Sequence, residues 1–157
     1  MIDSLSSIRV KEKSAGFIVF TRENDCLKYL FLKVGGRLDF PKGNIEENED
    51  ELSAALRELK EESGIEKIRI LPGFRKVLNY YYKRSDGALV SKTLILFLGE
   101  ALDKNVSVSW EHESFEWLSL SEALSRIKYA GYKEILKEAE EFVNKQIGSS
   151  LGKWFSN

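Results

Sequence analysis

GNIEENEDELSAALRELKEESGI, residues 43–65, is the stretch that decides the fold of this chain. Acidic residues outnumber basic residues in it by eight to two. Its second half repeats apolar residues at helical spacing, and Gly64 stands where a glycine commonly ends a helix. We therefore predict a helix over about Asn48–Ser63 that carries an unusual density of negative charge.

Three glutamates of this helix, Glu58, Glu61 and Glu62, are expected to share one side of it, because each residue advances by roughly 100°. Like charges at i and i+4 destabilise a helix, and no lysine follows these glutamates at i+4. Arg57 can pair with Glu61 at that spacing. An ordinary solvated helix face is the alternative, but a divalent cation with hard oxygen ligands, Mg²⁺ or Mn²⁺, would turn the repulsion into binding.

The same stretch carries a longer motif. Gly43, five residues, Glu49, seven residues and then RELKEESGI (residues 57–65) match G-x5-E-x7-R-E-U-x-E-E-x-G-U in full, where U is a bulky aliphatic residue. With average usage of about 6–7% for each of the fixed residues, a chance match is roughly a one in 10⁸ event per start position. The motif is the Nudix box, so the chain is identified as resembling the Nudix hydrolases.

That resemblance implies a fold and a site. The family fold belongs to the α/β class and is an α/β/α sandwich with a central mixed β-sheet. The enzymes of the family cleave a diphosphate bond in a nucleoside diphosphate linked to another group. The resemblance implies that Glu58, Glu61, Glu62 and the backbone carbonyl of Gly43 hold Mg²⁺ or Mn²⁺. Glu49 and Arg57 would orient the loop and the catalytic carboxylates.

Outside the box, the chain resembles the asymmetrical diadenosine tetraphosphate hydrolases of the animal and archaeal branch. The similar stretches are FPKGNIE, GFRKVLNYYY, SKTLILFLGE, WEHESFEWLSLSEAL and YKEIL, between about Gly16 and Phe142. The resemblance implies that Lys42 and Lys92 bind phosphates and that two tyrosines clamp a purine by stacking. These two tyrosines are Tyr80 and Tyr132.

Two further assignments come from the same resemblance. Glu111 matches a carboxylate outside the box that acts as a general base or an additional metal ligand. Relatives often have histidine or tryptophan before PKG, where this chain has GRLDF, so Arg37 is our candidate for a substrate-binding cation there. Each assignment has a plain structural alternative: a surface lysine, a core or surface tyrosine, or a loop carboxylate. We give the single histidine, His112, a minor polar role.

The remaining elements follow from turn signals and periodicity. We expect a hairpin of strands 15–20 and 28–34, a loop through Gly35–Gly36 and PKG, and two long strands over 67–84 and 89–102. A short strand within 114–120 should lead into a helix with a capping box of Ser119 and Glu122. A last helix is predicted over about Tyr132–Ile147, followed by a tail over about 148–157.

Composition limits the class of protein. The 157 residues suit a single domain over 1–157, and the net charge of −1 offers no overall basic field for nucleic acid. Cys26 is the one cysteine, which excludes an intramolecular disulfide. No long apolar run or leader-like segment stands out, so we expect a cytoplasmic protein with no membrane association and no obligate protein partner.

The leading functional hypothesis is a metal-dependent hydrolase that converts diadenosine tetraphosphate and water to ATP and AMP. One alternative is another Nudix specificity: an RNA 5′-triphosphate pyrophosphohydrolase, a diphosphoinositol polyphosphate phosphatase or a nucleoside triphosphate sanitiser. RNA 5′ ends are the one kind of nucleic acid that fits. The other alternative is a non-catalytic nucleotide-binding Nudix module. Retention of all the box glutamates argues against that module.

Overall fold

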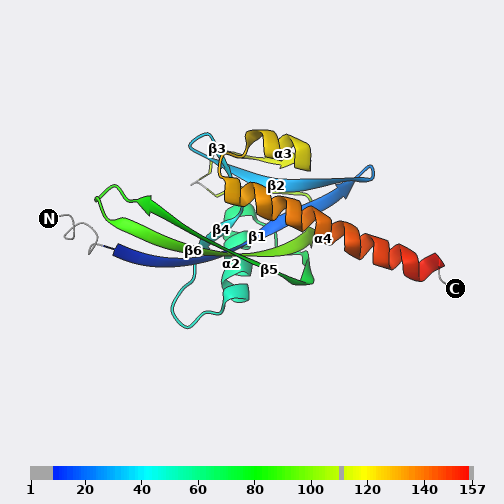
Figure 1. Ribbon diagram of the computed structural model, residues 1–157, viewed down its shortest axis with the longest axis horizontal. Coiled ribbons are helices and arrows are strands. Elements are labelled where there is room, and N and C mark those ends of the chain that lie inside the picture. Colours follow the sequence, from blue (N-terminus) through cyan, green and yellow to red (C-terminus); the bar gives the residue numbers. More distant parts are fainter. Residues whose placement is uncertain (1–8, 110–111, 156–157) are drawn as a thin grey trace.

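A seven-stranded sheet forms the centre of the computed structural model, which describes residues 9–109 and 112–155 (Figure 1). Its strands are β1 (Arg9–Glu23), β2 (Cys26–Val34), β3 (Arg37–Asp39), β4 (Lys42–Asn44), β5 (Ile68–Lys83), β6 (Leu89–Ala101) and β7 (Ser114–Leu118). The main path runs β3-β2-β1-β6-β5, with β4 paired to β1 and β7 paired to β2. Because β1 and β6 are parallel and the other pairs are antiparallel, the sheet is mixed, as predicted.

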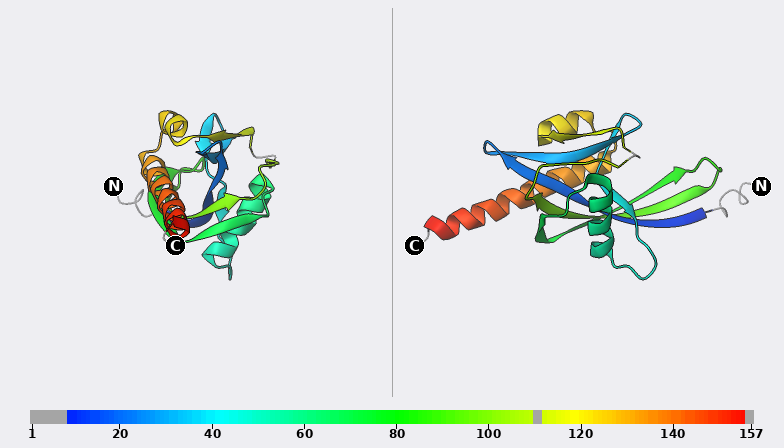
Figure 2. Two further views of the ribbon diagram at one scale, coloured as in Figure 1. Left: turned by 90° about the vertical axis from the view of Figure 1, so that its right-hand side faces the viewer. Right: turned by 180° about the vertical axis from the view of Figure 1, so that it is seen from behind.

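Helices cover both faces of this sheet. The helices are α2 (Glu51–Ser63), α3 (Leu120–Arg126) and α4 (Ala130–Phe155). α4 crosses the near face of the sheet in Figure 1, and α2 covers the other face, which is turned to the viewer on the right of Figure 2. Each side has its own apolar cluster, and alternate residues of β1, such as Phe17 and Ile18, contribute to the two clusters in turn. The predicted α/β/α sandwich is confirmed.

The first hairpin shows how local chemistry sets strand register. Asn24 and Asp25 both have positive φ, 51° and 65°, between the paired residues Glu23 and Cys26. Two left-handed residues make the two-residue turn that matches the twist of a hairpin, and asparagine and aspartate tolerate this conformation. The predicted hairpin is confirmed.

The acidic helix α2 begins later than predicted. Asn48 has a φ of 64°, and the side chain of Asp50 accepts a hydrogen bond from the backbone of Ser53 at 2.7 Å. Asp50 is therefore the N-cap, and the helix starts at Glu51 rather than near Asn48. The predicted end is confirmed, because Gly64 (φ 75°) donates its N–H to the carbonyl of Lys60.

β4 occupies part of the segment that we expected to be a loop. It pairs antiparallel with β1, with Ala15 opposite Gly43 and Gly16 opposite Lys42. A β-carbon at Gly16 would lie 2.3 Å from the carbonyl oxygen of Pro41, so this close approach requires glycine. The pairing fixes the segment before α2 against the centre of the sheet.

The C-terminal helix is longer than predicted. The capping box of Ser119 and Glu122 starts α3 as expected, but α4 continues past Ile147 to Phe155 and includes most of the segment that we expected to be a tail. Contacts of the Trp154 side chain lie outside the described part of the structure. No helix in the described ranges is long and apolar enough to cross a membrane.

Candidate active site

The candidate site has two parts, an acidic part beside α2 and a cleft lined by basic and aromatic side chains. Strand β4 lies between them, because successive side chains of a strand point to opposite faces. Lys42 and Asn44 point to one side, where the Asn44 amide oxygen accepts from Lys92 Nζ at 3.2 Å. Gly43 lies on the other side against α2. A β-carbon there would lie 2.0 Å from the carboxyl carbon of Glu58, so only glycine leaves room for that carboxylate.

On the α2 side, the guanidinium of Arg57 contacts three carboxylates of the motif, those of Glu49, Glu58 and Glu61. Its guanidinium donates to both oxygens of Glu49, at 2.8 and 3.0 Å, and to Glu58 at 2.8 Å. The predicted pair with Glu61 is present at 3.2 Å. Hydrogen bonds from Arg57 hold the pKa of Glu49 at about 2. Arg57 thus offsets part of the charge repulsion that the sequence alone showed.

Glu62 is a carboxylate in an unfavourable electrostatic environment. It accepts a hydrogen bond from the backbone N–H of Lys42 at 3.0 Å, and His112 Nε2 lies 3.7 Å from its Oε1. Burial raises the pKa of Glu62 to about 7; contacts with Lys42 act to lower it, and the charges of Glu58 and Asp39 add to the increase. A positive charge placed near this carboxylate would therefore be strongly stabilised.

The donor chemistry fits a divalent cation, although the carboxylates are not arranged around one. Within the described residues, no three Asp, Glu, His or Cys side chains converge closely enough to form a ready metal site. Glu61 is more than half exposed and turned towards Arg57. Glu58, beside Gly43, and Glu62, at the backbone of Lys42, offer only hard oxygen atoms, which suit Mg²⁺ or Mn²⁺. Glu111 lies outside the described residues, so its predicted role stays a prediction.

A cleft of about 610 Å³ opens on the other side of β4. It is lined by Gly36, Arg37, Leu38, Asp39, Lys42, Tyr80, Tyr82, Lys92, Arg126, Ile127, Lys128, Tyr129 and Tyr132. Five of these side chains are basic, four are tyrosines and one is acidic. The structure therefore brings together all five residues that we predicted to bind substrate. A cleft with this lining suits a phosphate chain attached to an aromatic base.

The two lysines predicted to bind phosphate are held differently. Lys42 Nζ pairs with Asp39 Oδ2 at 3.0 Å, whereas Lys92 Nζ lies 3.4 Å from Glu12. Burial acts to lower the pKa of Lys42, but Asp39, Tyr80 and Glu62 together outweigh it, and the pKa lies above its ordinary value. Burial, and then the charge of Lys42, lower the pKa of Lys92. Both side chains line the cleft, and their predicted role in phosphate binding stays a prediction.

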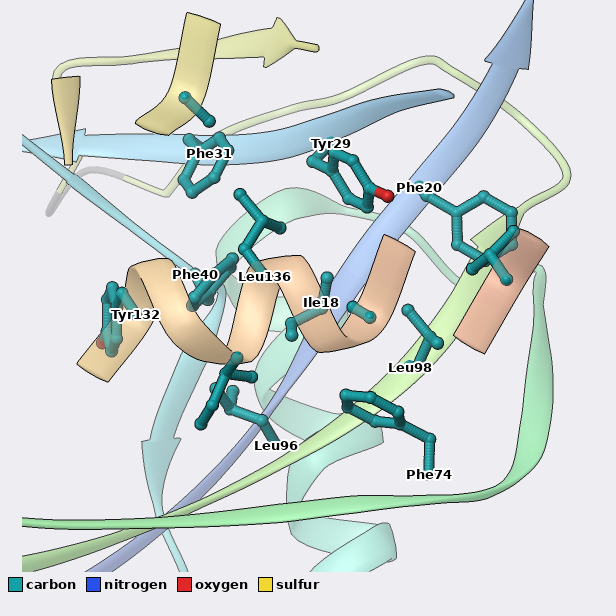
Figure 3. Close-up of a cluster of buried hydrophobic side chains, with 14 of the residues drawn as sticks. Ile18, Phe20, Tyr29, Phe31, Phe40, Phe74, Leu96, Leu98, Tyr132 and Leu136 are labelled. Carbon is teal, nitrogen blue, oxygen red and sulfur yellow. The ribbon is translucent and has the colours of Figure 1, made fainter. Parts of the chain in front are cut away.

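The two predicted base-binding tyrosines have different environments. Tyr80 is half-buried in the cleft. Tyr132 is only 7% exposed, its ring centre lies 4.7 Å from that of Phe40, and its hydroxyl donates to Asp39 at 2.7 Å. Figure 3 shows Tyr132 at one end of the apolar cluster beside Phe40. Tyr132 therefore packs as a core residue at the wall of the cleft.

Three residues of the site were missed or undervalued from the sequence. Asp39 joins Lys42 to Tyr132, Tyr129 contributes an exposed ring to the cleft, and His112 faces Glu62. Asp39 stands in no motif, and Tyr129 lies three residues before a tyrosine that seemed the better candidate. The usable signal for His112 was its position beside Glu111 in EHE.

Comparison with known proteins agrees with this geometry. The model of the NUDIX domain family matches residues 10–139 of the chain. Because this match covers most of the chain, the protein belongs to the Nudix family and is a Nudix hydrolase. Nudix hydrolases generally use divalent metal cations and act on small nucleotide substrates.

Several relatives carry a specific name. The asymmetrical bis(5′-nucleosyl)-tetraphosphatases of Mus musculus and Sus scrofa are 33% and 34% identical over 144 residues, covering 83% of this chain and 95% of each relative. A crystal structure of a C. elegans Ap4A hydrolase binary complex is 27% identical, with a TM-score of 0.73 over 85% of this chain and 98% of that one. The resemblance to this group of hydrolases is thus confirmed at moderate identity.

Proposed function

We propose that the protein hydrolyses dinucleoside polyphosphates, and that diadenosine tetraphosphate and water give ATP and AMP. The observation that carries the proposal is the arrangement of Lys42 on β4. Its side chain lines the cationic cleft, while its backbone N–H binds Glu62 of the acidic helix. A substrate phosphate held by Lys42 would therefore lie next to the carboxylates.

The side chains of the cleft would bind and orient the substrate. Lys42 and Lys92 would hold the phosphate chain, and Arg37 and Lys128, which also line the cleft, would meet negative charge further along it. The tyrosines would hold one base by stacking, which tolerates different bases. Fixed cations and a fixed base hold the reacting phosphate in place, and such positioning supplies much of the catalysis in phosphoryl transfer.

The carboxylates of α2 would hold the cation. We propose Mg²⁺, or Mn²⁺ in its place, bound by Glu58, Glu61 and Glu62 with the Gly43 carbonyl, and Glu111 as the general base or an additional ligand. When bound, the cation would offset the charge of the polyphosphate and act as a Lewis acid. Glu49 and Arg57 would orient Glu58, through the hydrogen bonds described above.

A substrate panel tests the proposal. The protein is incubated with Mg²⁺ and diadenosine tetraphosphate, triphosphorylated RNA, a diphosphoinositol polyphosphate or a mutagenic dGTP analogue, and kcat/KM is compared by ion-exchange chromatography. We expect the highest value for diadenosine tetraphosphate. A higher value for another compound would replace the substrate and keep the class of enzyme. Inactivity on all four, with retained nucleotide binding, would favour the non-catalytic module.

The cytoplasmic location and the lack of an obligate partner stay predictions.

A further inference from the structure

Tyr129 presents an accessible aromatic surface in the cleft. It lies between α3 and α4, lines the cleft and is 40% exposed, whereas Tyr132 is 7% exposed. The Tyr132 ring is already in contact with Phe40, and its hydroxyl is bonded to Asp39. A base entering the cleft would therefore meet the ring of Tyr129 before that of Tyr132.

The surroundings of Tyr129 hold its ring at this position. Its ring centre lies 5.6 Å from that of Tyr80 and 5.4 Å from that of Tyr132. A β-carbon at Gly131 would lie 2.7 Å from the Tyr129 ring, so the ring packs closely over the start of α4 where a glycine allows it. Contacts with Tyr80, Tyr132 and Gly131 thus hold the ring where it lines the cleft.

We propose that Tyr129, together with Tyr80, stacks on the base of the bound nucleotide and is a base-binding residue of this enzyme. The inference rests on the proposed nucleotide substrate. The Tyr80 and Tyr129 rings are tilted by 58° at this short distance, which leaves no parallel slot between them. The base therefore stacks on the open face of Tyr129, and Tyr80 contacts it from the side. The phosphates then extend towards Lys42 and Lys92, which line the same cleft.

The test separates base binding from phosphate binding. Calorimetry with Mg²⁺ measures the affinity of the protein for ATP, a product of the proposed reaction, and for inorganic tripolyphosphate, which has no base. Tyr129→Leu keeps an apolar side chain over Gly131 but removes the aromatic face. We expect about a tenfold loss of ATP affinity, the size typical of one stacked base, and a change below about twofold for tripolyphosphate.

Two further variants make the result specific. Tyr129→Phe keeps the ring and should retain ATP affinity within about twofold, because stacking needs the ring and not the hydroxyl. Tyr81→Leu is the matched control: Tyr81 is 62% exposed on β5 and does not line the cleft, so ATP affinity should not change. Thermal melting of each variant shows that the fold is retained.

The outcomes distinguish this inference from the proposed function. Unchanged ATP affinity in Tyr129→Leu, or an equal loss for tripolyphosphate, would overturn the role of Tyr129 even if the wild-type protein splits diadenosine tetraphosphate. A loss for ATP alone would support that role even if the wild-type protein does not hydrolyse diadenosine tetraphosphate.

Discussion

The acidic site and the cationic cleft lie on opposite sides of β4 and carry opposite excesses of charge. On the α2 side, burial raises the pKa of Glu62 to about 7, and the charges of Glu58 and Asp39 add to the increase. In the cleft, five basic side chains and one acid, Asp39, form the lining, while Glu12 and Glu116 pair with two of the basic groups from outside it, so basic groups still outnumber acids. Neither half is balanced by itself. A divalent cation and a polyphosphate would balance both at once, which is why we treat them as one active site.

The role of the acidic site in the reaction is tested by removing the charge of one carboxylate. Glu62→Gln keeps an acceptor for the Lys42 N–H but removes the charge that would bind the cation. We expect kcat for diadenosine tetraphosphate to fall by at least about 100-fold, because changing only a supporting group of a metal site already costs about 10–100-fold. Stopped assays with chromatographic separation of the products measure the rate.

Glu66→Gln is the control for this variant, because Glu66 is exposed beyond the end of α2 and pairs only loosely with Lys60, at 3.6 Å. Its rate should equal that of the wild type. Full activity of Glu62→Gln would show that the acidic site does not take part in the reaction.

Glu62→Gln, which is expected to lower activity, should raise the stability of the protein at high pH. Because the folded pKa of Glu62 is about 7 and the ordinary value is 4.5, the folded protein binds the proton more tightly. Wild-type stability therefore falls as pH rises from about 4.5 to 7, and the loss is complete above 7. In EDTA at pH 8, we expect Glu62→Gln to be more stable by about 1–3 kcal/mol.

Denaturant unfolding at pH 4 and pH 8 measures this difference. It should nearly vanish at pH 4, where Glu62 is protonated in both states. A Glu62→Gln protein that is less stable than the wild type at pH 8 would contradict the environment described for this carboxylate.

The cleft is tested by removing a cation. Lys92→Met keeps the length and apolar stem of the side chain but removes its ammonium group. We expect KM for diadenosine tetraphosphate to rise about tenfold, because hydrogen bonds to a charged group contribute about 1.5–3 kcal/mol. Lys104→Met, at an exposed loop position outside the cleft, should leave KM unchanged. Equal KM values for both variants and the wild type would remove Lys92 from the binding site.

The smallest effect is expected at Asp39. If this carboxylate positions Lys42 and the Tyr132 hydroxyl, Asp39→Asn should raise KM about threefold with little change in kcat, because one charge-assisted pair is lost. If it only repels phosphate, KM should fall instead. Steady-state kinetics therefore decide by the sign of the change. The control is Asp86→Asn, which breaks a similar pair with Arg84 in the turn between β5 and β6 and should leave KM unchanged.

The acidic site could be predicted from sequence because it is almost local. Its residues lie within one loop and one helix, so their spacing alone indicates which carboxylates share a side of α2. The pair of Arg57 with Glu61 agrees with that expectation, whereas the role of Glu49 was implied by the family resemblance and not by helical spacing. The contact between Arg57 and Glu58 does not follow from helical spacing, because it depends on how the side chain of Arg57 is oriented.

The cleft was harder to predict because its residues come from distant segments. Tyr80 and Lys92 were assigned through family resemblance, and Arg37 through a departure from it. Strand pairing in the folded sheet is what brings Tyr80 opposite Lys92 and places Arg37 on β3 beside β2. Exposure is also a property of the folded chain. Tyr129 and Tyr132 are similar in sequence terms, yet packing buries one and leaves the other accessible.

The most direct test of the account is hydrolysis of diadenosine tetraphosphate by the wild-type protein in ¹⁸O-labelled water with Mg²⁺. Mass spectrometry of the separated products identifies the bond that is broken. The account predicts equal amounts of ATP and AMP, one ¹⁸O atom per pair of products and no reaction in EDTA. Two molecules of ADP, or no turnover with Mg²⁺ or Mn²⁺, would contradict it.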